Sequence, residues 1–335
     1  MKKSFYIIGI LLICMFFIVA CGKNDIKEKK RDKVELPDVE ISDNFNMNLI
    51  KLTRRKQNYL ISPYSIEIAL NMLNDGANEK TKEEISRVLP NRKINDVSIK
   101  NRIKIANALF IKDEYKNKVK DEYKNELKKT YDSEILYDKF KTPDVINDWV
   151  NNKTDGMITK ILDEMDPDFA IGLANAVAID VNWASEFECT STTKEEFTKV
   201  DNKKIDVEMM HKSYKSGGFK YLKSSDATGI IIPYKSYDKK TGEEDYQNGS
   251  YLEFIGILPN ESVEDYIVNL TEDKLNGLID SGKPASNKYQ INLSLPRFKY
   301  EYEIPNFKEV LMSMGINSAF SEDEADFSNI INKKD

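Results

Sequence analysis

The stretch ISPYSIEIALNMLNDGANEKTKEEI, residues Ile61–Ile85, decides how the first half of this chain folds. Proline cannot continue a strand ladder and serine favours a helix N-cap, so Ser62-Pro63 predicts a tight turn that begins a helix. Apolar residues then recur at helical spacing, at Ile66, Ala69, Leu70 and Leu73. The stretch therefore predicts a turn followed by an amphipathic helix.

The end of the same stretch predicts a second helix. Gly76 suits a C-terminal cap of the first helix, and Thr81 followed by Glu84 has the spacing of a capping box. Upstream, residues 41–55 carry apolar side chains at helical spacing, and residues 58–61 predict a short buried strand.

Helical patterns precede most of the strand-like segments in the rest of the chain. Further helices are predicted at 122–130, 145–154, 263–279 and 307–314. Strands or alternating segments are predicted at 103–111, 170–181, 193–197, 207–210, 218–221, 229–234, 251–258 and 288–298, with a polar loop at 239–250. This order predicts an α+β fold in which helices pack on mixed β-sheets.

The N-terminus has the form of a bacterial lipoprotein leader. Lys2 and Lys3 precede a nearly continuous apolar run over 5–19, and Ala20 precedes Cys21. We therefore expect residues 1–20 to be a signal peptide and Cys21 to carry the lipid. The alternatives are a plain secretion signal or an uncleaved anchor with a chance cysteine.

The charged residues that follow the leader lack apolar periodicity. Residues 21–40 are therefore expected to form a disordered tether behind the lipidated cysteine. The folded domain would then lie on the extracellular side of the cytoplasmic membrane or at the cell surface.

Composition excludes several classes of function. The 50 basic and 56 acidic residues are interspersed, with a net charge of −6, which argues against a nucleic-acid-binding face. Cys14, Cys21 and Cys189 give no disulfide framework. His211, the one histidine, rules out a multi-histidine metal site and lies near no nucleophile-elbow pattern. We expect no metal, no cofactor and no enzymatic activity.

Several segments resemble landmarks of the serpin superfamily and occur in the family's order. They span about residues 41–330, and no single one is specific alone. They are Ser62-Pro63, Ser65-Ile66, Ala69-Leu70, Gly76-Ala77, Ala106-Asn107-Ala108-Leu109-Phe110, Trp149-Val150, Asn175-Ala176, Trp183, Pro233-Tyr234, Leu258-Pro259, Leu295-Pro296 and Ala325-Asp326-Phe327-Ser328.

The resemblance implies a metastable protein that inhibits an extracellular serine or cysteine protease. In the family the protease cuts an exposed reactive loop, which then inserts as a new strand in the large sheet. By this resemblance, Ser62, Ser65 and Asn175 lie where the sheet must part. Trp183 lies near the top, where insertion begins.

The sequence also departs from the family pattern. Asp180 stands where the family usually has lysine. After Ile330 the family continues into a strand, the reactive loop and the last strands, whereas residues 331–335 read as a short charged tail. We therefore expect 41–330 to be an incomplete serpin-like domain that does not inhibit as given and is marginally stable or partner-dependent. The alternative is a non-inhibitory surface binding lipoprotein or a degenerate serpin remnant.

Overall fold

A computed structural model describes residues 11–13 and 36–332, except positions 56, 217, 300, 301, 303 and 305. The described α-helices are α1 (Phe45–Thr53), α2 (Pro63–Gly76), α3 (Glu79–Val88), α4 (Asp121–Tyr131), α5 (Asp144–Lys153), α6 (Val263–Asn269), α7 (Glu272–Asp280) and α8 (Phe307–Ser313). The strands are β1 (Leu11–Ile13), β2 (Ile103–Lys112), β3 (Glu134–Asp138), β4 (Ile171–Ile179), β5 (Thr192–Thr198), β6 (Lys204–Tyr214), β7 (Lys220–Lys223), β8 (Ala227–Pro233), β9 (Glu253–Pro259), β10 (Lys283–Pro284) and β11 (Ile291–Pro296).

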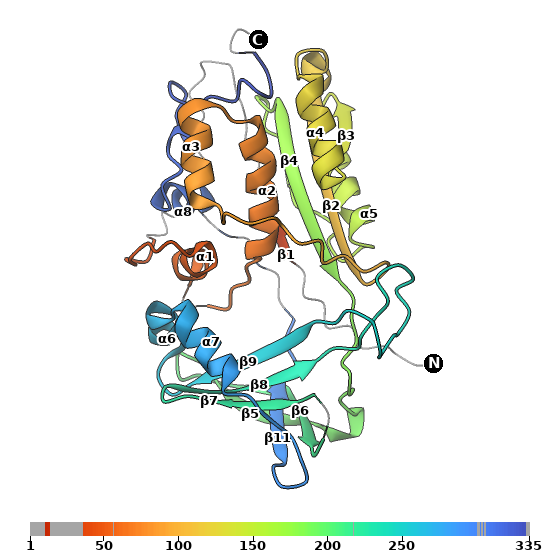
Figure 1. The fold of residues 1–335 in the computed structure, drawn as a ribbon, viewed down its shortest axis with the longest axis vertical. Coiled ribbons are helices and arrows are strands. Elements are labelled where there is room, and N and C mark those ends of the chain that lie inside the picture. The colour runs from red at the N-terminus through yellow and green to blue at the C-terminus, as the bar shows by residue number, and fades with distance from the viewer. Residues whose placement is uncertain are drawn as a thin grey trace.

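The described strands form three sheets (Figure 1). The large sheet has the order β1-β4-β2-β3, and β4 runs antiparallel to β2 from Ile179, opposite Ile103, to Ile171, opposite Ile111. The other two sheets, in the orders β10-β7-β8-β9 and β11-β6-β5, lie below it in the view of Figure 1. Strands, helices and mixed pairing agree with the predicted α+β class.

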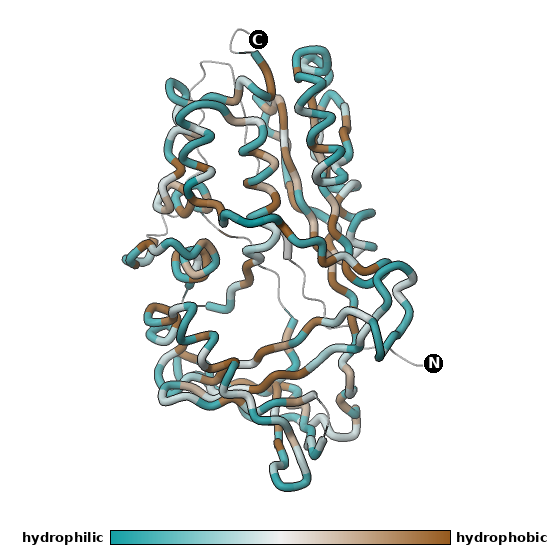
Figure 2. The backbone as a smooth tube through the Cα atoms, in the orientation of Figure 1, coloured by the Kyte–Doolittle hydropathy of each residue, from teal (hydrophilic) through white to brown (hydrophobic). Residues whose placement is uncertain are grey.

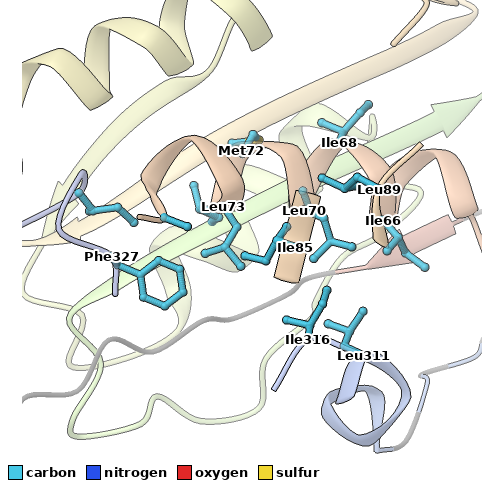
Figure 3. Packing of buried hydrophobic residues seen from close by; sticks show 14 of the residues in the cluster. Ile66, Ile68, Leu70, Met72, Leu73, Ile85, Leu89, Leu311, Ile316 and Phe327 are labelled. Atoms are coloured by element: carbon cyan, nitrogen blue, oxygen red, sulfur yellow. The ribbon is translucent and has the colours of Figure 1, made fainter. Parts of the chain in front are cut away.

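Both faces of the large sheet are covered by apolar side chains. Alternate residues of β2 and β4 join one cluster with α2, α3 and α8, part of which appears in Figure 3. The intervening residues of both strands pack on the other face against α5, where Phe110 meets the Trp149 ring edge-on at 5.7 Å. Figure 2 shows hydrophobic residues along β2 and β4 and mostly hydrophilic ones on α4. A strand covered on both faces reads as a continuous apolar run, as the β4 sequence does.

The predicted capping box of the second helix is wrong. Asn78 is the N-cap residue of α3, and its side chain makes no capping hydrogen bond. Thr81 Oγ instead accepts the N–H of Asp326 at 3.0 Å, and a Glu84 carboxylate oxygen accepts the N–H of Ser318 at 2.7 Å. The C-terminal segment thus occupies the polar side chains that local spacing assigns to a cap.

Gly76 ends α2 but does not act as the predicted C-cap. The cap residue is Ala77, and Gly76 is absent from the glycines with positive φ among the described residues. A Cβ at Gly76 would overlap the side chain of Ile330. Glycine is therefore needed there for close approach of the C-terminal segment.

Two other predictions concern the segments that flank α1. The predicted strand at 58–61 is wrong, because this stretch is half-buried or exposed and has no strand assignment. Within the predicted tether, Leu36 and Val39 pack against the α2 cluster. Residues 21–35 lie outside the described residues, and so does the predicted lipid attachment at Cys21.

No helix in the described part of the chain is long and apolar enough to cross a membrane.

Candidate functional site

The turn before α2 aims a serine at the large sheet. Ser62 is the N-cap, and its hydroxyl oxygen accepts the N–H of Ser65 at 3.1 Å, with Pro63 in the first turn. This arrangement satisfies an N–H that the helix leaves without a partner. Ser65 itself is fully buried, and its hydroxyl donates to Asn175 Oδ1 on β4.

Asn175 continues the hydrogen-bond chain across the sheet. It lies directly opposite Asn107 of β2, and its amide nitrogen donates to Asn107 Oδ1 at 2.7 Å. Asn107 in turn donates to the backbone oxygen of Tyr131 at 2.7 Å. Both asparagines are buried, so each of these bonds replaces contact with water that folding removes.

The series of polar contacts that begins at Ser65 of α2 returns to the same helix at Asp75. The Tyr131 hydroxyl donates to Asp75 Oδ2 at 2.7 Å, near the C-terminus of α2. Burial raises the pKa of Asp75, and the Tyr131 hydrogen bond opposes that rise. Ser65, Asn175, Asn107, Tyr131 and Asp75, the polar network, thus join α2, α4, β2 and β4. Ser65, Asn107 and Asn175 are buried, and a buried polar group that is fully paired favours one packing arrangement.

The polar network lies beside an open strand edge. One edge of β4 pairs with β2 along its whole length. In the part of the chain that the structure describes, its other edge pairs only with β1, opposite Asn175, Ala176 and Val177. Asn175, one member of the network, therefore lies at a position where β4 pairs with an antiparallel strand.

Trp183 lies apart from the polar network. It follows β4, where the chain leaves the large sheet, and forms a bridge with Tyr234. Its ring stacks on Tyr234 at 4.4 Å and meets Phe254 and Phe187 edge-on at 5.5 and 5.9 Å. Trp183 therefore packs between the end of the large sheet and the segment that follows β8.

Of the predicted site residues, the structure brings Ser65 and Asn175 into direct contact. Ser62 acts one step away, through the Ser65 backbone, and Trp183 packs elsewhere. Asn107 was not predicted as a site residue. Part of its signal is visible in the sequence, because Ala-Asn-Ala occurs in both strands, and the structure pairs the two asparagines.

His211 lies on β6 within hydrogen-bond distance of three polar side chains, those of Thr193, Glu195 and Ser294. Its Nε2 is 2.6 Å from Glu195 Oε1, and its Nδ1 is 3.0 Å from Ser294 Oγ. Hydrogen bonds from Thr193 and His211 lower the pKa of Glu195. The group lies on an exposed sheet face, where water screens each interaction, and it is a solvated cross-strand cluster. The described residues contain no group of three or more metal-ligating side chains placed to hold an ion.

Known proteins resemble this chain along most of its length. A family model described as Serpin (serine protease inhibitor) matches residues 40–335. An uncharacterized serpin-like protein of Thermococcus kodakarensis is 28% identical over 330 residues, which covers 92% of this chain and 71% of that protein. Neuroserpin of Homo sapiens is 28% identical over 317 residues, which covers 86% of this chain and 73% of neuroserpin.

Solved structures agree with these relatives. The thermophilic serpin tengpin in its latent state matches with a TM-score of 0.71 and 31% identity, over 86% of this chain and 77% of that chain. Tengpin in its native state matches with a TM-score of 0.71 and 29% identity, over 89% of this chain and 77% of that chain.

Proposed function

Because this chain belongs to the serpin family, we propose that it is a protease inhibitor that accepts a cleaved loop as a new strand beside β4. The observation that carries this proposal is the burial of β4 together with the incomplete pairing of its outer edge. Its residues are buried on both faces, yet its outer edge is paired in the described structure only with β1, which lies within the proposed signal peptide. A doubly covered strand with free backbone N–H and C=O groups favours pairing with a further strand.

The proposed reaction belongs to the protease, and the inhibitor turns over no substrate. A serine or cysteine protease attacks a peptide bond of the reactive loop and forms an acyl-enzyme, releasing the C-terminal side of the loop. The N-terminal side of the loop then pairs with β4 and carries the acylated protease with it. Ser65 and Asn175 lie where the helix α2 and the large sheet must adjust to the new strand.

We place the inhibitor at the cell surface, held by a lipid on Cys21. The positive start, the apolar run over 5–19 and the small residue before the cysteine support this location. Such an anchor would hold the protein where secreted proteases arrive from outside. Extracellular serine or cysteine proteases are therefore the proposed partners.

The test uses the native protein extracted from its own membranes with detergent. Intact mass and C-terminal peptide coverage come first, followed by incubation with a panel of serine and cysteine proteases. We expect a complex that survives boiling in SDS and forms only with active protease. The matched control is each protease with its nucleophile replaced by alanine.

Two results would exclude the covalent route. One is a native protein that ends at Asp335, since the scissile loop would then be missing. The other is a longer protein that forms no stable complex with any protease of the panel. Either result favours the alternative proposal, a non-inhibitory surface lipoprotein that binds its partner without cleavage.

A further inference from the structure

The segment between β8 and β9, residues 235–250, is a folded unit and is called here the 235–250 loop. Tyr237 and Ser250 exchange two backbone hydrogen bonds, at 2.9 and 2.8 Å. The backbone N–H of Gly242 donates to Asp238 O at 2.9 Å, and that of Asp245 donates to Ser236 O at 2.9 Å. Its polar sequence thus folds back on itself through backbone hydrogen bonds.

Tyr237 fixes the base of the loop beside the large sheet. Its side chain is fully buried, in a cluster with Ile99, Ile103 and Val181. Its hydroxyl oxygen accepts the N–H of Asn182 at 3.1 Å. These contacts attach the loop to the segment that follows β4.

The same tyrosine and the body of the loop also hold the segment before β2. The Arg102 guanidinium lies 4.7 Å from the centre of the Tyr237 ring, and its Nε donates to Gly242 O at 3.2 Å. The N–H of Lys100 donates to Lys239 O at 3.0 Å. Gly242 has a φ of +74°, and a Cβ there would overlap the carbonyl oxygen of Lys100. The backbone of the loop at Gly242 therefore lies so close to the backbone of Lys100 that only glycine fits there.

Direct bonds complete a ring of contacts at this end of the sheet. Asp180 N–H donates to Arg102 O at 2.7 Å, and Lys235 N–H donates to Asn182 O at 2.7 Å. The start of β2 and the end of β4 thus bond to each other directly, and the loop joins both of them to the end of β8. Trp183 lies immediately beyond this ring.

We propose that the 235–250 loop is a clamp that ties the paired ends of β2 and β4 to the end of β8, and so limits how readily this end of the large sheet shifts to admit a strand beside β4. The inference rests on the proposed function, because it assigns regulation to the strand-accepting edge of β4. Loosening the loop frees residues 180–183 and speeds uptake of an added strand. Tightening it slows uptake.

The test compares two glycine-to-alanine variants of the full chain. Gly242→Ala forces a side chain against Lys100, whereas Gly277→Ala, in α7, has no atom within 4 Å of the new Cβ and is the matched control. The readout is amide hydrogen exchange at 96–103 and 180–183. We expect exchange to rise about tenfold in both segments for Gly242→Ala, because a forced contact destabilises the clamp locally.

A second readout measures strand uptake directly. The probe is a fluorescent nine-residue peptide of alternating threonine and valine, matched to the length of β4. We expect faster uptake by Gly242→Ala than by Gly277→Ala. A further variant, Tyr237→Phe, removes only the hydroxyl and is expected to raise exchange at 180–183 alone, which preserves the test where Gly242→Ala fails to fold.

The outcomes separate the clamp from the strand-accepting role. Unchanged exchange at 180–183 in both Gly242→Ala and Tyr237→Phe overturns the clamp. A rise confined to 96–103 in Gly242→Ala overturns the hold of the loop on the end of β4. A rise in both segments, with no peptide taken up by any variant, supports the clamp and refutes the proposed strand acceptance.

Discussion

Replacing Asn175 by alanine tests whether the polar network holds α2 to the sheet. The substitution removes the acceptor of the Ser65 hydroxyl and the donor to Asn107 Oδ1, and both partners are buried. Each buried polar group left without a partner costs about 1–3 kcal/mol, so the expected loss is about 2–6 kcal/mol in free energy of unfolding. Typical domains have a free energy of unfolding of about 5–15 kcal/mol, so the expected loss is a large fraction of the total stability.

The assay is urea unfolding of the full chain in mild detergent, monitored by tryptophan fluorescence. The exposed asparagine Asn248 provides the matched control, and Asn248→Ala is expected to change stability by less than about 0.5 kcal/mol. The double variant with Ser65→Ala should lose less than the sum of the two single variants, because both remove the same bond. A loss below about 1 kcal/mol for Asn175→Ala, or strict additivity with Ser65→Ala, would refute the reasoning.

Three further predictions concern the chain termini and the helix α3. Burial alone raises the pKa of Glu84, but hydrogen bonds from 317–318 bring it below the ordinary 4.5. Its stabilisation is therefore present above 4.5 and is lost as pH falls through the lowered folded pKa, so urea midpoints of Glu84→Gln should depend less on acidification. Gly76→Ala should lower the thermal midpoint, because overlap with Ile330 costs about 1–3 kcal/mol and outweighs the helix gain; an unchanged midpoint would contradict this. Cys21→Ser should move the protein from the detergent phase to the aqueous phase, and continued membrane retention of the variant would argue against lipidation.

Local patterns in the sequence predict the fold where neighbours along the chain supply the interactions. The start of α2 follows from Ser62 and Pro63, because capping uses residues three positions apart. The course of β4 follows from its apolar run, because both of its faces are covered. These elements need no knowledge of the distant chain.

Other features depend on partners that no local pattern names. Thr81 and Glu84 have capping-box spacing, yet residues 317–326 take their oxygens. The position of Gly76 suggests a helix cap, yet glycine is needed there because the Ile330 side chain packs against it. The contact of Ser65 with Asn175 could be placed in the sequence only through family resemblance, and Asn107 becomes evident only once the register of β2 and β4 is known.

The hydrogen bonds that α3 and the end of α2 make with the C-terminal segment also constrain the order of folding. Glu84 accepts hydrogen bonds from Asn317 and Ser318, which are separated from it by 233 and 234 positions in the sequence. The backbone oxygen of Ala77 accepts one from Asn329, at a separation of 252 positions. Contacts of such sequence separation close late and slow the search for the native state. A chain that is synthesised N-terminus first must therefore keep α2 and α3 partly uncovered until residues 317–329 are available to pack on them. Exposed apolar surface on these helices would favour aggregation or chaperone binding during that interval.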